Sequence, residues 1–229
     1  MNLPLVDQVI RSRRKTVAIL VRPDGKVIVR APLRLSREKI LAFVQSKAGW
    51  IAARKAEAQE IQQQVAHRKR RFAEGETFPV LGREYPLRLA GGPKTGLWFS
   101  EGFVLNSENL PQAAALFERW YRAMARKILT ERTRFYAQTF GLTYQKLRIS
   151  STQTRWGSCS SHGTLSFTWR LVMAPLEVVD YVVVHELAHL RHPNHSAAFW
   201  AEVARMMPDY KTHRDWLKKN GRFLTLQQA

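Results

Sequence analysis

The sequence is poor in cysteine and acidic residues and has no long apolar run. Cys159 is the only cysteine in 229 residues, which excludes an intrachain disulfide and a zinc site built from several cysteines. The longest apolar runs, at 171–176 and 181–184, are far too short to cross a bilayer. The residues after Met1 lack the basic and apolar regions of a signal peptide. We therefore expect a cytoplasmic protein with no membrane contact.

Acidic residues are scarce relative to basic ones. The chain has 18 Asp and Glu against 37 Lys and Arg, a net charge of +19. Residues 1–71 alone hold 17 of the basic residues and 5 of the acidic ones. A hydrophobic fraction of 45% favours a folded chain despite this charge. The charge favours polyanionic partners, so the basic N-terminal part is a candidate nucleic-acid surface, with a solvated basic face as the alternative.

The first half of the chain has the pattern of short strands and one helix. Two β-branched runs flank the turn 23–25 and predict a hairpin over 16–32, and Ser36 is a candidate N-cap for a helix that ends near Gln64. Short β-like segments over 77–105 are expected to continue the N-terminal sheet. The segment 109–111 marks a boundary, so we expect a basic, β-rich subdomain over 1–108 and a catalytic domain over 109–229.

The second half alternates longer helices with two strands. The pattern predicts a long amphipathic helix to about Phe140, strands over 147–151 and 164–171, a helix from Pro175 through His189, a helix capped by Ser196, and a last helix ending at Gly221. Phe135 is expected on the apolar face of the long helix. The fold class is therefore α+β, with a mainly β N-terminal part.

The most informative motif is His-Glu-Leu-Ala-His over 185–189. Two histidines four residues apart lie on one helical face, so both can bind one metal ion at about 2.0–2.1 Å. Glu186 is placed to act as general base toward a water that the metal activates. The valine-rich segment before it predicts a buried helix, in which these polar residues are costly without a function.

A catalytic zinc usually needs a third protein ligand. Pro193 and Asn194 are expected to turn the chain and return His195 to the site, whereas His192 precedes a proline and is the competing candidate. Zinc is the expected metal, although nickel, cobalt or iron also bind such nitrogens. Three further residues are candidates to stabilise the transition state: Tyr210, His213 and Arg155.

Several linked motifs resemble the YgjP-like family of metal-dependent hydrolases. The motifs that carry the resemblance are RWGSCSS (155–161), WRLVMAP (169–175), DYVVVHELAH (180–189), NHSAAFW (194–200), PDY (208–210) and WLKKNG (216–221), with SRR (12–14) and RPDG (22–25) near the start. They extend over nearly the whole chain. Together they are far more specific than the five-residue motif at 185–189.

The resemblance implies a zincin-like (minigluzincin) core related to the SprT-like and WLM proteases. It implies His185, His189 and His195 as metal ligands and Glu186 as the catalytic residue. The expected activity is that of a zinc-dependent metallopeptidase on a peptide or protein. A metal-dependent nucleotide phosphohydrolase and a nucleic-acid-associated protease or binding module are the alternative hypotheses, and the oligomeric state does not follow from the sequence.

Overall fold

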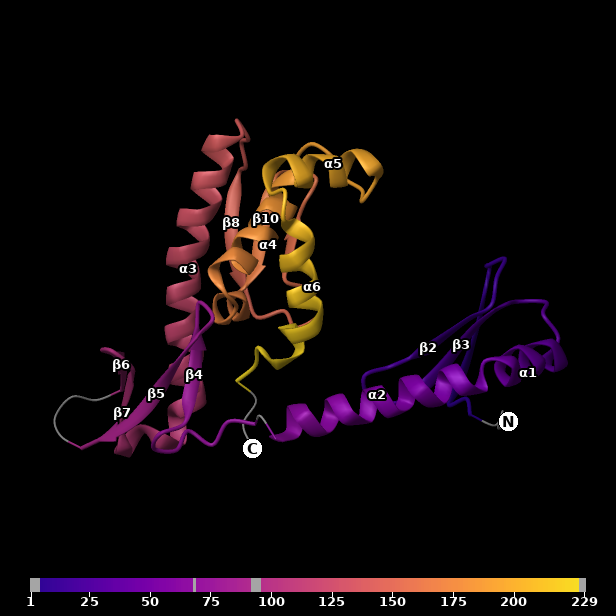
Figure 1. Cartoon of the computed structure of the whole chain (residues 1–229), viewed down its shortest axis with the longest axis horizontal. Coiled ribbons are helices and arrows are strands. Elements are labelled where there is room, and N and C mark those ends of the chain that lie inside the picture. Colours follow the sequence, from indigo (N-terminus) through magenta and orange to yellow (C-terminus); the bar gives the residue numbers. More distant parts are fainter. Residues whose placement is uncertain (1–4, 68, 92–95, 227–229) are drawn as a thin grey trace. The chain divides into compact units, whose positions relative to one another are not determined.

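The computed structural model describes residues 5–67, 69–91 and 96–226, with the backbone alone for 65–67. The chain forms two compact units, an N-terminal unit (Met1–Lys69) and a C-terminal unit (Arg70–Ala229), and each is described by itself. Figure 1 shows the elements of both units. Among the described residues, no helix combines the length and apolar character that a membrane span requires.

The N-terminal unit is a three-stranded sheet with two helices. Its elements are β1 (Gln8–Ser12), β2 (Ala18–Val21), β3 (Val27–Pro32), α1 (Arg37–Ser46) and α2 (Ala48–His67). The central strand β3 is antiparallel to β2, as expected for the hairpin, and parallel to β1. At the hairpin turn Gly25 has a φ of 78°, which glycine adopts without steric cost. Aliphatic side chains of β3, α1 and α2 form a small core between the sheet and the helices.

The expected single helix over 36–64 is two helices. The Ser36 side chain accepts a hydrogen bond from the Lys39 backbone N–H at 3.4 Å, so the predicted N-cap is confirmed. The first helix ends at Lys47, whose φ of −110° and ψ of 10° are not helical. This break lets Ile40 and Val44 on α1 and Ile51 on α2 contact the same core.

The C-terminal unit holds the remaining elements. They are β4 (Thr77–Val80), β5 (Arg83–Ala90), β6 (Leu97–Phe99), β7 (Phe103–Asn106), α3 (Ala113–Thr139), β8 (Lys146–Ser150), β9 (Gly157–Cys159), β10 (Thr164–Thr168), α4 (Leu176–Ala188), α5 (Ala197–Met206) and α6 (Tyr210–Asn220), with short 3₁₀ turns η1 (Ser107–Gln112), η2 (Trp169–Met173) and η3 (Gly221–Phe223). The unit is mixed α+β, with two separate sheets.

The strands β4–β7 form a sheet of their own and do not continue the N-terminal sheet. Its order is β4-β5-β7-β6, and β5 and β7 are parallel, so it is not a simple meander. Phe78 of β4 stacks on Phe117 of α3 with ring centroids 4.2 Å apart, and Phe103 of β7 lies 4.8 Å from the same ring. These buried aromatic contacts attach the sheet to α3, so the compact units divide after Lys69 and not after residue 108.

The helix α3 spans the C-terminal unit and packs against α4 and β8 (Figure 1). Arg132 on α3 donates two hydrogen bonds, of 2.6 and 2.7 Å, to the carboxylate of Asp180 on α4, and Tyr136 donates a third. Asp180 is 6% exposed, so this bidentate pair supplies the partner that a buried carboxylate needs. The prediction for Phe135 is wrong: its side chain is 50% exposed, and the Arg132 guanidinium lies over its ring.

Candidate metal centre

The helix α4 carries the first two histidines of the site. It begins after Pro175, and His185 lies in its last turn with His189 as its C-cap. The two rings lie one helical turn apart with centroids at 5.0 Å. Most of α4 is buried between α3, β9 and the helices α5 and α6, so both imidazoles have fixed surroundings.

The third histidine returns to the first two from the start of α5. Ser196 caps α5 by accepting a hydrogen bond from the Phe199 N–H, which places His195 immediately before the helix. The Nε2 atoms of His195 and His185 are 3.0 Å apart, and one ring nitrogen from each histidine lies within 4.8 Å of the others. Two nitrogens that share one tetrahedral zinc lie roughly 3.3 Å apart. The spacing of these three nitrogens is therefore compatible with one metal ion of the size of zinc.

His192 contributes its backbone instead of its ring. Its carbonyl oxygen lies 3.0 Å from Nδ1 of His189, which places the His189 proton on Nδ1 and leaves Nε2 as a lone-pair donor. The side chain of His192 is not among the three that the structure brings together. The third histidine of the cluster is His195, which the sequence favoured over His192 as the third ligand.

Phe199 forms the floor under all three histidines. It is fully buried, and its ring centroid lies 4.9 Å from that of His185, 4.5 Å from His189 and 4.8 Å from His195. The buried Nδ1 of His185 has no hydrogen-bond partner among the described residues, so packing orients that ring. The sequence did not reveal this role, because the contact of Phe199 on α5 with His185 and His189 on α4 depends on the packing of the two helices.

Burial favours the neutral form of the two imidazoles on α4, His185 and His189. Desolvation, with smaller contributions from His189 and His195, lowers the pKa of His185 to about 3. Burial also lowers the pKa of His189, against the opposing effect of its hydrogen bond to His192. Neutral rings offer lone pairs at any pH near 7, and only neutral imidazole binds a metal.

Glu186 follows His185 on α4, lines the same cavity as the three histidines and is 5% exposed. Burial raises its pKa to about 8, and the positive charge of Arg155 acts in the opposite direction. A Cβ atom at Gly157 would lie 2.5 Å from Oε1 of Glu186, so only glycine lets β9 approach the carboxylate this closely. Gly157 is a second residue whose role the sequence did not reveal.

Two cavities meet at His185, Glu186 and Gly157. The histidine cavity has a volume of about 440 Å³ and is also lined by residues 158–161, His189, Pro193 and His195. The tyrosine cavity has a volume of about 270 Å³ and is lined further by Arg155, Trp156, Tyr181, Val182 and Leu217. A molecule bound across Glu186 therefore has room on both sides of the carboxylate.

The strand β9 forms one wall of the histidine cavity. It pairs with β10 alone and lies at the edge of the sheet β8-β10-β9. Cys159 lines this wall, and burial raises the pKa of its thiol, with a further contribution from Glu186. Its sulfur is not part of the histidine cluster.

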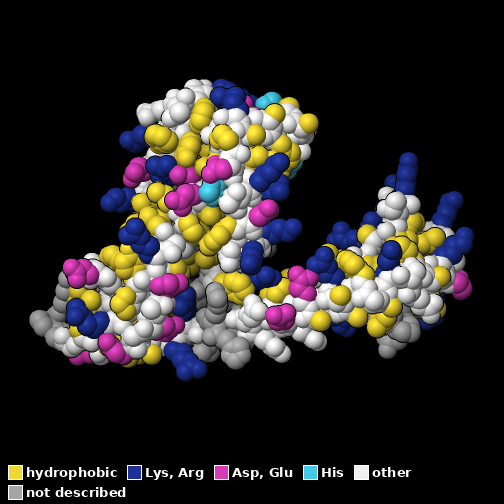
Figure 2. Space-filling view, viewed as in Figure 1, with side chains coloured by type: hydrophobic (Ala, Val, Ile, Leu, Met, Phe, Trp, Pro, Cys, Tyr) yellow, Lys and Arg dark blue, Asp and Glu magenta, His cyan; other side chains and the backbone are white. Residues whose placement is uncertain are grey.

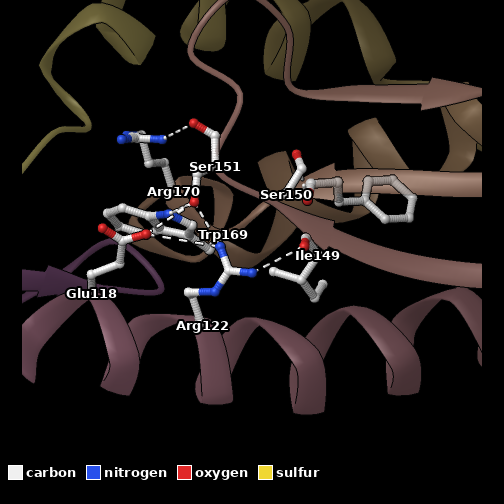
Figure 3. Close-up of polar contacts among 8 residues, drawn as sticks. Glu118, Arg122, Ile149, Ser150, Ser151, Trp169 and Arg170 are labelled. Atoms are coloured by element: carbon white, nitrogen blue, oxygen red, sulfur yellow. Dashed lines mark hydrogen bonds and ion pairs between the residues drawn. The ribbon is translucent and has the colours of Figure 1, made fainter. Parts of the chain in front are cut away.

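The segment that leads into β9 is held at its start by Ser151, as Figure 3 shows. The Ser151 hydroxyl accepts hydrogen bonds from Arg122 on α3 and from the Trp169 indole, at 2.6 and 3.2 Å, and donates to Glu118 at 2.9 Å. Its carbonyl accepts a hydrogen bond from Arg170. These contacts fix the beginning of the 151–156 connection that carries Arg155 to the tyrosine cavity.

The remaining candidates lie in different surroundings. Arg155 lines the tyrosine cavity, as described above. Tyr210 is buried against Trp200 and Tyr181, and His213 pairs with Asp209 at 3.0 Å. Neither Tyr210 nor His213 is among the described residues that line the two cavities.

Comparison with known proteins identifies the family. The family model of the YgjP-like metallopeptidase domain matches residues 15–220. Among solved structures, the metallopeptidase zymogen abylysin of Pyrococcus abyssi shares 23% identity at a TM-score of 0.38, over 44% of this chain and 99% of that one. The zymogen jannalysin of Methanocaldococcus jannaschii shares 17% identity at a TM-score of 0.33, over 42% and 94%.

No significant match was found among curated proteins. The two structural similarities are too distant to add to the assignment, which depends on the family model and its extent. That family implies a divalent metal, and the three histidines provide nitrogens that fit one. The chain therefore belongs to the YgjP-like metallopeptidase family and is a metallohydrolase.

Proposed function

We propose that the protein is a zinc-dependent peptidase in which His185, His189 and His195 bind the metal and Glu186 is the general base. The observation that carries the proposal is the cluster of three imidazoles beside one buried carboxylate, in a cavity walled by an edge strand. Zinc bound to three imidazoles supplies Lewis acidity and lowers the pKa of water toward about 7.

Glu186 has the environment of a proton carrier. Its burial raises the pKa to about 8, so the carboxylate is a stronger base than an exposed glutamate. It accepts the proton of the attacking water and, once protonated, delivers that proton to the nitrogen of the leaving amine. Because Gly157 has no side chain, β9 and its edge lie directly against this carboxylate.

The edge strand β9 suits an extended peptide. Gly157, Ser158 and Cys159 pair with Phe167, Ser166 and Leu165 of β10, and the same three residues line the histidine cavity. A peptide that adds to this edge receives main-chain hydrogen bonds independent of its sequence. Its scissile bond then lies beside Glu186 and its side chains point alternately toward the two cavities.

The tyrosine cavity selects one side chain of that peptide. Trp156, Tyr181, Val182 and Leu217 provide an apolar lining, and an apolar cavity of about 150 Å³ is enough for benzene. At about 270 Å³ the cavity accepts a phenylalanine or leucine side chain next to the scissile bond. Arg155 at its edge is the candidate group to donate to the carbonyl oxygen as negative charge develops.

Three expectations from the sequence have no specific structural observation in their favour. Hydrolysis of a nucleoside triphosphate stays a prediction from charge and metal chemistry. The cytoplasmic location and the choice of zinc over nickel, cobalt or iron also stay predictions.

The test compares Glu186→Gln with the unchanged protein, both loaded with zinc. Peptide mixtures and nucleoside triphosphates are incubated side by side, with products identified by mass spectrometry. We expect peptide cleavage that falls by about 10²–10⁴-fold in the variant, because general acid–base catalysis contributes that factor, while zinc content stays at one per chain. Triphosphate hydrolysis without peptide cleavage, lost in the same variant, would replace the peptidase proposal with the phosphohydrolase alternative.

A further inference from the structure

The N-terminal unit holds most of the excess charge. Its sequence has 15 Lys and Arg against 5 Asp and Glu in 69 residues. Among its described residues, Lys26 pairs with Asp24 and Arg54 pairs with Glu57. Figure 2 shows Lys and Arg side chains at several separate places on the visible face of this unit. The unit therefore presents cations that far outnumber their acidic neighbours.

The same unit has a hollow at the junction of its two helices. Ile19 of the edge strand β2, Phe43 of α1, Lys47 between the helices and Trp50 of α2 line it, and its volume is about 210 Å³. We call it the tryptophan hollow. Trp50 is 45% exposed, and the guanidinium of Arg54, one helical turn further, lies 5.8 Å from its ring. A large ring thus remains open to solvent between two basic side chains.

Two neighbouring apolar side chains of β2 point to opposite faces of the sheet. Ile19 packs toward the helices and lines the hollow. Neighbouring side chains of a strand point to opposite faces, so Leu20, 46% exposed, lies on the other face of the sheet. An anionic membrane would require both on one side.

We propose that the tryptophan hollow binds single-stranded nucleic acid, with an unpaired base stacked on Trp50 and neighbouring phosphates held by Lys47 and Arg54. Stacking on an aromatic side chain beside basic groups is how proteins hold single strands without reading their sequence. The hollow is larger than the cavity of about 150 Å³ that accepts benzene, so it admits one flat ring. Paired bases in a duplex are not free to enter it.

The proposal is tested with the full zinc-loaded chain and a fluorescently labelled 15-nucleotide oligo(dT), alongside its duplex with oligo(dA). Anisotropy is measured between 50 and 200 mM salt. We expect tighter binding of the single strand, with an affinity that falls as salt rises. Lys47→Ala and Arg54→Ala each reduce the slope of log K against log salt by about 0.7, the value for one phosphate contact on a single strand.

The decisive variant is Trp50→Ala, which weakens single-strand binding by about 5- to 150-fold, the range for one stacked base. Trp50→Phe keeps most of the affinity. Phe135→Ala is the matched control, because Phe135 is also a half-exposed ring under an arginine but lies in the C-terminal unit. It leaves the affinity unchanged. Circular dichroism and zinc content check that each variant is folded.

Three results overturn the proposal. The first is single-strand affinity that Trp50→Ala leaves unchanged, which would mean that the cations alone bind the strand and no base stacks on Trp50. The second is equal affinity for the duplex. The third is binding to vesicles of phosphatidylcholine and phosphatidylserine, lost in Trp50→Ala, without binding to the oligonucleotide. Peptide hydrolysis is measured on the same samples, and Trp50→Ala leaves it unchanged, so the outcome is independent of the peptidase proposal.

Discussion

The two units of the chain differ in which polar groups they bury. Among the described residues, all buried polar or charged side chains lie in the C-terminal unit. Asp180 and Glu186 on α4 are two of them. The N-terminal unit buries aliphatic side chains and leaves its many cations exposed. A buried charge is costly unless it has a partner or a chemical role, whereas an exposed charge costs little and acts at a distance.

The buried carboxylate of Glu186 in the C-terminal unit concerns the reaction, whereas the exposed cations of the N-terminal unit concern the binding of anionic molecules. Asp180 has a partner in Arg132, whereas Glu186 borders the cavity with the histidines. The net charge of +19 therefore says little about the reaction. It describes the kind of molecule that approaches the protein.

The largest effect is expected from the third histidine. His195→Ala removes one of three nitrogens and should abolish stoichiometric zinc binding after dialysis, and with it all hydrolysis. Elemental analysis and a peptide assay measure both. His192→Ala is the matched control and should retain the metal, because His192 contacts His189 through its backbone carbonyl. If His192→Ala loses zinc and His195→Ala keeps it, the ligand assignment is wrong.

The next effect is a pH dependence of stability in metal-free protein. Burial raises the pKa of Glu186 from an unfolded value of 4.5 to about 8, so the folded state binds more protons than the unfolded state between these values. Stability from this group is complete below pH 4.5 and is lost as the pH rises to about 8. Glu186→Gln should therefore be more stable than the unchanged chain at pH 9, by up to roughly 5 kcal/mol at 1.4 kcal/mol per pKa unit.

The measurement is urea unfolding in the presence of a chelator from pH 5 to pH 9. His185, whose pKa is lowered to about 3, makes both proteins less stable as the pH falls below 6.5, and its contribution cancels in the difference. A stability difference that does not grow with pH would show that Glu186 is solvated in the free protein.

A smaller effect is the stabilisation by zinc, which should act on the C-terminal unit and not on the N-terminal unit. Zinc at about 100 times its Kd stabilises the folded state that binds it by about 2.7 kcal/mol. We expect this gain in the C-terminal unit alone, seen by hydrogen exchange as slower opening of α4 and α5. Ile51→Ala, which truncates a fully buried side chain of the N-terminal unit, should instead destabilise only that unit. Zinc protection of α1 and α2 would contradict the separation.

The smallest effect concerns substrate choice. Leu217→Phe fills part of the tyrosine cavity and should lower kcat/KM for a peptide with phenylalanine beside the scissile bond by roughly 10- to 200-fold relative to the alanine peptide. Leu224→Phe is the control, because Leu224 is equally buried, at 8% exposed, and lines neither cavity. Equal losses for both peptides would exclude the cavity as a selective site.

Much of the local structure follows from short sequence signals. The turn 23–25, the caps at Ser36 and Ser196 and the helix that begins after Pro175 were predicted because each depends on residues within a few positions. The strands over 77–106 were assigned to the wrong sheet. Their position depends on the contacts of Phe78 and Phe103 with Phe117 of α3. A local sequence pattern does not predict these contacts, because the residues are far apart in the chain.

Some features of the candidate site also follow from the sequence, and others depend on the tertiary structure. The spacing of His185 and His189 on one helix and the turn before His195 are properties of the sequence, as is the excess of positive charge in the N-terminal part. Tertiary structure decided that Phe199 lies under all three rings, that Gly157 brings β9 against Glu186, and that a second cavity opens beside the carboxylate. Periodicity and capping act over a few residues along the chain, whereas close packing and desolvation depend on groups that only the folded chain brings together.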